Sequence, residues 1–428
     1  MEKPNRQQLK QIDSIMFKFI WKNKRDKIKR SILKSSHSKG GLKVPDPSLQ
    51  ADSLKTVWIK KAMDENCNAK WKAVMKDKLF VTDSVSIFRC DMSQQQALQH
   101  FESHFWAEVF LTWSGCHQQS DRSASEALST VLWKNKNMCL ERKKILPVRK
   151  LIEQGVIRVA DLYHNGERRL MTVVELREKY RIGNFLIWQA ILRSIPRAIS
   201  ELITQKRPRR SVSPKVFEEL ASQQKPAKWA YKKLLQQFES DQMSIQQRRW
   251  QTEINGEPLD WTTIYSHVYS VTDDFELRWF QYQLLQRILP TNRLLYLYQL
   301  IDSDECVFCP GIKENITHSF WDCRLSKQFW AQLKSLLGLR GFLSLKTIIT
   351  GVYRQREDIS SKAIMHCVLL AKRFIWRSRK AAQPPNIRGF TLAFSEYIRV
   401  ERYVALVNRR MDEFLAKWSG VMERVGVG

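Results

Sequence analysis

The run CVFCPGIKENITHSFWDC at residues 306–323 gathers four potential metal-binding side chains in a short stretch. Its Cys306, Cys309, His318 and Cys323 follow the spacing C-x2-C-x8-H-x4-C. Three thiolates and one imidazole suit a tetrahedral Zn²⁺ ion, and a Cys-x2-Cys pair fits a tight turn that aims both sulfurs at one point. The alternative is four unrelated core residues, because a Cys-x2-Cys pair alone is weak support for a metal site.

The residues around this motif offer few other means of ordering the segment. Pro310, Gly311 and Asn315 lie inside it, and all three are poor helix or strand formers. A bound metal would fix the loop and anchor the start of the next helix. We therefore predict a zinc site with these three cysteines and the histidine as ligands.

Net charge is the second constraint. The chain has 72 Lys and Arg against 43 Asp and Glu, which gives a formal net charge of +29. Such an excess indicates a polyanionic partner, and nucleic acid is the usual one. An acidic membrane surface is the rival, but the best apolar stretch, residues 185–195, is about half the length that a bilayer helix needs. We expect RNA or DNA bound mainly through its phosphates, and no membrane.

The cysteine content and the N-terminus indicate the compartment. The N-terminal run MEKPNRQQLK is charged and lacks an apolar signal core. The chain has eight cysteines, three of them in the motif, which favours a reducing compartment with free thiols elsewhere. We expect a nuclear or cytoplasmic protein that is not secreted.

Apolar residues recur mostly at three- and four-residue steps, which predicts a mainly α protein. A chain of 428 residues is too long for one ordinary core, so we expect multi-domain helical bundles with a small zinc-binding loop. Thr172 and Glu175 are spaced as a capping box. The predicted segments are 1–90, helical with a basic loop; 91–202, a helical middle domain; 203–225, a basic, proline-containing linker; 226–345, a helical domain with the metal motif; and 346–428, basic C-terminal helices.

Three basic clusters are the candidate contacts to a polyanion, because positive charge binds phosphate and aromatic planes stack on unpaired bases. The alternative is solvated helix faces with their aromatic residues in the core, and for the linker a solvated interdomain tether. A nuclear-import signal is a second functional interpretation of the linker, and it is compatible with a tether. In a helix, Lys372, Trp376 and Arg379 lie on one side. The candidates are Trp21, Lys22, Lys24, Arg25, Lys27, Lys29, Arg30, Lys206, Arg207, Arg209, Arg210, Lys372, Arg373, Trp376, Arg377, Arg379 and Lys380.

Four blocks of the sequence resemble the carboxy-terminal part of non-LTR (LINE-type) retrotransposon polyproteins. FKFIWKNKRDKIKRSILKSSHSKGGLKVPDP resembles the thumb segment that follows the polymerase palm, and the unit at residues 133–196 resembles the segment downstream of it. WFQYQLLQRILPTNRLLYLYQLIDSDECVFC with HSFWDC resembles the zinc-binding segment and its lead-in helix. LLAKRFIWRSRK resembles the closing helices. The matches are scattered, in order, from about residue 10 to residue 418.

The resemblance also implies what this chain lacks. Polyproteins of this family carry an endonuclease and a reverse transcriptase whose palm holds two metal ions on three acidic residues. The resemblance places this chain after that palm. Its Asp-Asp pair, Asp273-Asp274, lacks the neighbours of the polymerase motif and is expected to cap a helix. The sequence contains no P-loop, no G-x-S-x-G motif and no endonuclease set. We expect no catalytic residues and no enzymatic activity.

In this family the corresponding region grips template RNA and target DNA while the palm copies. The resemblance therefore implies a non-catalytic, zinc-stabilised nucleic-acid-binding region within a ribonucleoprotein, with the catalytic portion of a retrotransposon polymerase as a further candidate partner. Two other classes stay open at this point. In the first alternative, the chain is an inert relic of a truncated element. In the second, it is a scaffold that docks onto an intact polymerase or a host factor through its apolar helices.

Overall fold

The computed structural model divides the chain into two compact units. Unit 1 comprises Met1–Ile20 and Pro45–Glu239, and unit 2 comprises Trp21–Val44 and Ser240–Gly428. Helices dominate both units, which confirms the mainly α prediction. No helix among the described residues is long and apolar enough to span a bilayer. The structure describes residues 3–64, 66–72, 97–98, 103–117, 124–133, 135, 138, 151–152, 154–164, 166–181, 184–205, 215–238, 242–256, 258–354 and 357–426.

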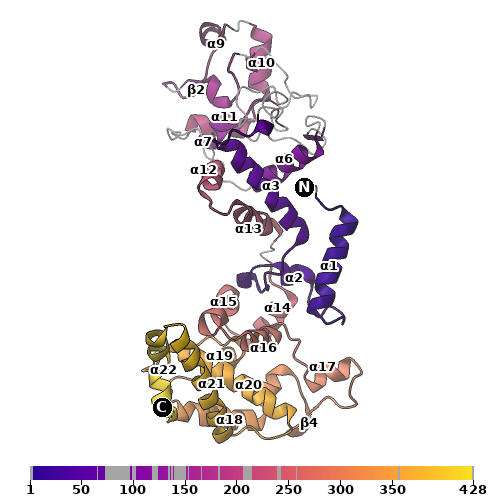
Figure 1. The fold of residues 1–428 in the computed structure, drawn as a ribbon, viewed down its shortest axis with the longest axis vertical. Coiled ribbons are helices and arrows are strands. Elements are labelled where there is room, and N and C mark those ends of the chain that lie inside the picture. The colour runs from indigo at the N-terminus through magenta and orange to yellow at the C-terminus, as the bar shows by residue number, and fades with distance from the viewer. Residues whose placement is uncertain are drawn as a thin grey trace. The chain divides into compact units, whose positions relative to one another are not determined.

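Unit 1 is built around the long helix α3, which packs against α13 and α6. Asp46 starts α3 because its carboxylate accepts hydrogen bonds from the backbone N–H groups of Ser48 and Leu49, and proline occupies the first helical position. The elements of unit 1 are α1 (Arg6–Ile20), α3 (Pro47–Met63), α6 (His104–His117), α7 (Ala124–Ser129), η3 (Val159–Leu162), β1 (Tyr163–His164), β2 (Arg169–Leu170), α9 (Val173–Tyr180), α10 (Phe185–Ser194), α11 (Arg197–Gln205), α12 (Lys215–Ser222) and α13 (Pro226–Phe238) (Figure 1).

The predicted capping box is confirmed at the start of α9. The Thr172 hydroxyl accepts a hydrogen bond from the Glu175 N–H, and the Glu175 carboxylate accepts one from the Thr172 N–H. This reciprocal pair fixes where α9 begins, directly after the antiparallel pair β1 and β2.

Unit 2 has one continuous apolar core, to which α14, α15, α16, η4, α18, α19, α20, α21 and α22 contribute buried residues. Six residues of α16 are buried, so most of this helix is internal to unit 2. The elements of unit 2 are α2 (Arg30–Lys34), η1 (His37–Lys39), α14 (Ile245–Ile254), α15 (Trp261–Val271), α16 (Phe275–Leu285), α17 (Asn292–Leu297), β3 (Glu305–Cys306), β4 (Cys309–Lys313), the π-helical turn η4 (His318–Asp322), α18 (Arg324–Leu336), α19 (Leu345–Thr350), α20 (Ser361–Lys380), α21 (Ile387–Val407) and α22 (Met411–Val425).

Residues 21–44 belong to unit 2, although about 200 residues separate them from the rest of it. The His37 ring stacks on Tyr269 of α15 with centroids 3.9 Å apart. A β-carbon on Gly41 would lie 2.0 Å from the backbone carbonyl oxygen of Ser35, and Gly40 has a φ of +82°. The Gly40-Gly41 pair therefore allows the tight loop that lays this segment on α15.

The units differ from the five segments that the sequence suggested. The part of the segment 226–345 that follows α13 shares one core with residues 346–428, because α15 and α16 pack on α20, whereas α13 itself belongs to unit 1. The segment 1–90 is split, since residues 21–44 fold with unit 2. In the predicted linker 203–225, residues 206–214 lie outside the described residues, and α12 follows them. The sequence missed this division because the contacts that join segments far apart in the chain leave no local pattern.

Candidate metal centre and basic surfaces

The four predicted ligands converge in unit 2 on one site that can hold a metal ion. The ligand atoms of Cys306, Cys309, His318 and Cys323 all lie within 4.8 Å of one another. Cys306 and Cys309 face each other across the antiparallel hairpin formed by β3 and β4. The Phe308 N–H points at the Cys306 sulfur, 3.4 Å away, as expected in a turn that gathers thiolates.

The histidine enters this site from the turn η4. The His318 N–H donates to the Asn315 side-chain oxygen at 2.7 Å, which fixes the start of the turn. Its ring is buried, and the buried Nε2 atom has no hydrogen-bond partner among the described residues. A buried ring nitrogen without a partner is costly unless something else binds it. A metal ion held together with the three sulfurs would satisfy this atom.

Electrostatics in the cluster favours a thiolate at Cys323. The hydrogen bond with Cys306 lowers the pKa of the Cys323 thiol, and the backbone N–H groups of Ser326 and Leu325 lower it further. The same contact raises the pKa of Cys306. Helix α18 begins directly after Cys323, so the ligand sits at the positive end of a helix dipole, as a thiolate prefers. The prediction that the motif leads directly into a helix is confirmed.

Glu314 supports the hairpin, and the sequence reading missed it. Its side chain is fully buried and pairs with Arg379 of α20 through two contacts, of 2.6 Å and 3.0 Å. It also accepts a hydrogen bond from the Asn292 N–H at 2.9 Å, and its own N–H donates to the Asp304 carbonyl at 2.7 Å. Glu314 thus ties the hairpin to α17 and α20. The available signal was an acidic residue inside the metal motif of a strongly basic chain.

A second group, His164, Glu167 and Glu175, also has metal-ligating atoms close together. Here Arg169 already neutralises both carboxylates, with contacts of 2.5 Å to Glu167 and 2.8 Å to Glu175. The hydrogen bonds from Arg169 and Thr172 lower the pKa of Glu175 to about 2. These contacts join the β1–β2 hairpin to the N-terminal cap of α9, so the group has a structural role.

The first basic cluster forms an exposed turn. Lys22, Lys24, Arg25, Lys27 and Lys29 are all exposed, and no ion pair or hydrogen bond to their side chains occurs in the part of the chain that the structure describes. The turn is held by apolar anchors at both ends, because the side chains of residues 21 and 28 are buried. Two further residues, Arg30 and Trp21, were predicted for this cluster. Arg30 forms an ion pair with Asp26 at 2.7 Å.

Trp21 is buried, and its ring lies 6.4 Å from that of Trp279. This corrects the expectation that Trp21 stacks on a base, because its side chain is buried. The second cluster, Lys206, Arg207, Arg209 and Arg210, lies outside the described residues.

The third cluster is largely structural. Lys372, Trp376 and Arg379 do share one side of α20, but that side faces the core. Lys372 is fully buried, and Trp376 is 6% exposed and stacks on Phe320. Arg379 pairs with Glu314, as described above. These three predicted contacts are corrected: packing occupies their side chains.

The remaining members of the third cluster differ from one another. Arg373 pairs with Glu276 of α16 and is half-buried. Arg377 and Lys380 are exposed, and neither forms an ion pair within the described ranges. Only these two residues of the cluster remain free to meet a phosphate.

The buried amine of Lys372 predicts a pH-dependent stability of unit 2. Its Nζ donates to the Gln281 side chain, and burial lowers its pKa to about 7. Because the pKa is higher in the unfolded chain, the unfolded state binds more protons between pH 7 and about pH 10. Stability should therefore rise with pH over this range, by up to about 1.4 kcal/mol per unit. Lys372→Met should abolish this rise.

Thermal unfolding at pH 7, 8 and 9 measures this slope. Lys362→Met, an exposed position on the same helix, is the matched control and should keep the wild-type slope. Equal slopes for Lys372→Met and wild type would show that the amine is not the source.

The Asp-Asp pair has the role predicted for it. The Asp274 side chain caps α16 by accepting hydrogen bonds from the N–H groups of Glu276 (2.8 Å) and Leu277 (3.2 Å). Asp273 pairs with Arg278 at 2.7 Å. Both carboxylates are thus explained by helix capping and charge pairing.

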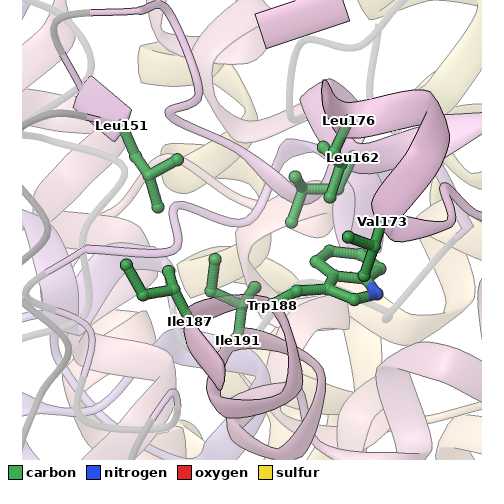
Figure 2. Close-up of a pocket in the computed structure, with 7 residues that line it drawn as sticks. All are labelled: Leu151, Leu162, Val173, Leu176, Ile187, Trp188 and Ile191. Carbon is green, nitrogen blue, oxygen red and sulfur yellow. The ribbon is translucent and has the colours of Figure 1, made fainter. Parts of the chain in front are cut away.

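An apolar cavity in unit 1 is too small for a substrate (Figure 2). Its volume is ≈ 10 Å³, whereas ligand pockets usually exceed roughly 300 Å³. The lining side chains carry no acid or base, and the Trp188 indole nitrogen is their single polar atom. They are Leu151, Leu162, Val173, Leu176, Ile187, Trp188 and Ile191.

No protein-family model matches this sequence.

Proposed function

We propose that this chain is a nucleic-acid-binding module corresponding to the thumb-to-C-terminal region of a LINE-type reverse transcriptase, without the catalytic palm. The observation that carries the proposal is the exposed basic turn at residues 22–29. Five cations there lack acidic partners within the described structure, in a chain of net charge +29. When the cations of such a turn neutralise phosphates, the counterions condensed on the nucleic acid are released, which drives binding of RNA or single-stranded DNA.

The metal in this proposal is Zn²⁺. At a Zn–S distance of about 2.3 Å, tetrahedral geometry places two thiolates roughly 3.8 Å apart. The sulfurs of Cys309 and Cys323 are 3.7 Å apart, and the buried Nε2 of His318 supplies the nitrogen ligand. Four protein ligands leave no open position, so the ion would stabilise the hairpin rather than activate a substrate.

The basic turn predicts salt-dependent binding that a defined variant should lose. Lys22, Lys24, Arg25, Lys27 and Lys29, all changed to Gln, should weaken binding to a fluorescein-labelled 20-nucleotide RNA or DNA strand. Each lost phosphate contact reduces the log–log salt slope by about 0.7 on single strands, so the slope should fall by up to about 3.5. Fluorescence anisotropy between 50 and 200 mM NaCl measures both the affinity and the slope.

A control variant removes the same charge from unit 1. Arg177, Lys179, Lys225, Lys228 and Lys232 are exposed and can be changed to Gln together. This variant should bind more tightly than the turn variant and keep a steeper slope. If the two variants behave alike, or if wild type shows no binding at 50 mM salt, the turn is not a phosphate-binding site.

A further inference from the structure

Helix α21 carries an apolar face that no described part of the chain covers. Its inner side packs on the core of unit 2 through Phe394, Ile398 and Ala405, next to α20 and α22 (Figure 1). On the opposite side, five large apolar side chains are 62% to 70% exposed. They are Leu392, Val400, Tyr403, Leu406 and Val407. Exposed apolar residues concentrated on one helix face mark an interaction site rather than ordinary surface.

The same face is strongly basic. Arg399 and Arg402 lie on the helix beside the apolar residues, Arg388 is in its first turn, and residues 409 and 410 follow its end. All five arginines are exposed, and the described structure contains no ion pair to any of them. Of the two acidic residues of α21, Glu401 pairs with Lys417 at 2.8 Å. Glu396 is therefore the one exposed acid on α21.

We propose that this outer face of α21 binds an acidic, amphipathic α-helix of another protein. Val400, Tyr403 and Val407 recur at three- and four-residue steps, which is the seam that a second helix packs against. The flanking arginines select a partner whose own flanks carry Glu or Asp. The inference goes beyond nucleic-acid binding and does not depend on it.

Other occupants fit this face less well. Aliphatic side chains such as Leu392 and Leu406 offer no plane for a base to stack on, so a nucleic acid would leave them exposed to water. A second copy of the chain would bring five arginines against five. Glu396 lies in the apolar stripe between Leu392 and Val400, so an anionic bilayer on this face would bury a carboxylate against like charge. A helical partner can instead place one Lys opposite Glu396.

A designed peptide tests the proposal with the full-length, zinc-loaded chain. The probe is a fluorescein-labelled 21-residue peptide with Leu at the a and d heptad positions and Glu at e and g. Its controls are the same peptide with Lys at e and g, and a scrambled peptide of identical composition. We expect anisotropy to show binding of the Glu peptide at least about tenfold tighter than either control. The scrambled control separates seam recognition from general attraction to a basic chain.

Variants of the chain locate the binding. The double variant Val400→Ser, Val407→Ser keeps the charge and removes the apolar seam. It should weaken binding of the Glu peptide at least about tenfold. Arg399→Gln with Arg402→Gln should also weaken it. Val174→Ser, at an exposed position of α9, is the control and should change nothing.

Four outcomes would overturn the proposal. They are equal binding of the Glu and scrambled peptides, unchanged binding by the serine variant, self-association of the chain that the serine variant abolishes, and binding to phosphatidylserine vesicles that depends on the same two valines. Circular dichroism of the variants establishes that they remain folded.

Discussion

Changing Cys306 or Cys323 to Ser is expected to abolish zinc binding at the proposed site and to unfold the hairpin at residues 305–323. Sulfur ligands dominate the site, and the hairpin has only two short strands of its own. Structural zinc contributes about 10–16 kcal/mol to the folding of small zinc peptides, so loss of one ligand should outweigh any other single change in this segment. Zinc content by mass spectrometry and hydrogen exchange over residues 304–323 provide the two measurements.

Only substitutions of the proposed ligands should cause zinc loss and faster hydrogen exchange in the hairpin. Cys67→Ser, a cysteine outside the cluster, is the control and should retain one Zn²⁺ per chain with unchanged exchange. Chelation of the wild-type protein should reproduce the exchange pattern of the variants. One zinc ion per chain in both the Cys306 and the Cys323 variants would refute this ligand set.

Arg379→Ala is expected to lower the free energy of unfolding of unit 2 by about 3–5 kcal/mol. The change leaves the fully buried Glu314 carboxylate without its charge partner, and the Arg379 side chain is itself only 10% exposed. Because Glu314 lies between the hairpin strands and His318, the hairpin should also exchange faster. Urea unfolding of unit 2, followed by hydrogen exchange in α20, measures the loss.

A matched control lies two residues away. Arg377→Ala removes an exposed arginine of the same helix and should change stability by less than about 0.5 kcal/mol. Adding Glu314→Gln to Arg379→Ala should recover part of the loss, because it removes the uncompensated charge. Equal stabilities of the Arg377 and Arg379 variants would show that the ion pair contributes nothing.

Local features of the fold were predictable from the sequence. The ligand cluster, the helix that begins after Cys323, the capping box at Thr172 and the cap at Asp274 each depend on residues only a few positions apart. In each case the chemistry and the spacing are complete within one short stretch, so no distant part of the chain is needed to specify them.

The orientation of α20 was not predictable in the same way. Periodicity correctly placed Lys372, Trp376 and Arg379 on one side of a helix, yet it could not say whether that side faces water. The partners that bury this side are Gln281, Phe320 and Glu314, about 60 to 90 residues earlier in the chain. A Lys–Arg–Trp pattern therefore looks like a phosphate-binding surface until those partners are known.

The Cys306, Cys309, His318 and Cys323 cluster, the helical character and the basic turn at residues 22–29 could be predicted from neighbouring residues and their charges. The tertiary structure alone decided that residues 21–44 join unit 2, that the basic side of α20 is internal, and that the apolar side of α21 is exposed. The physical reason is that burial is a property of pairs of surfaces. A sequence pattern defines one surface, and only the folded chain supplies the other.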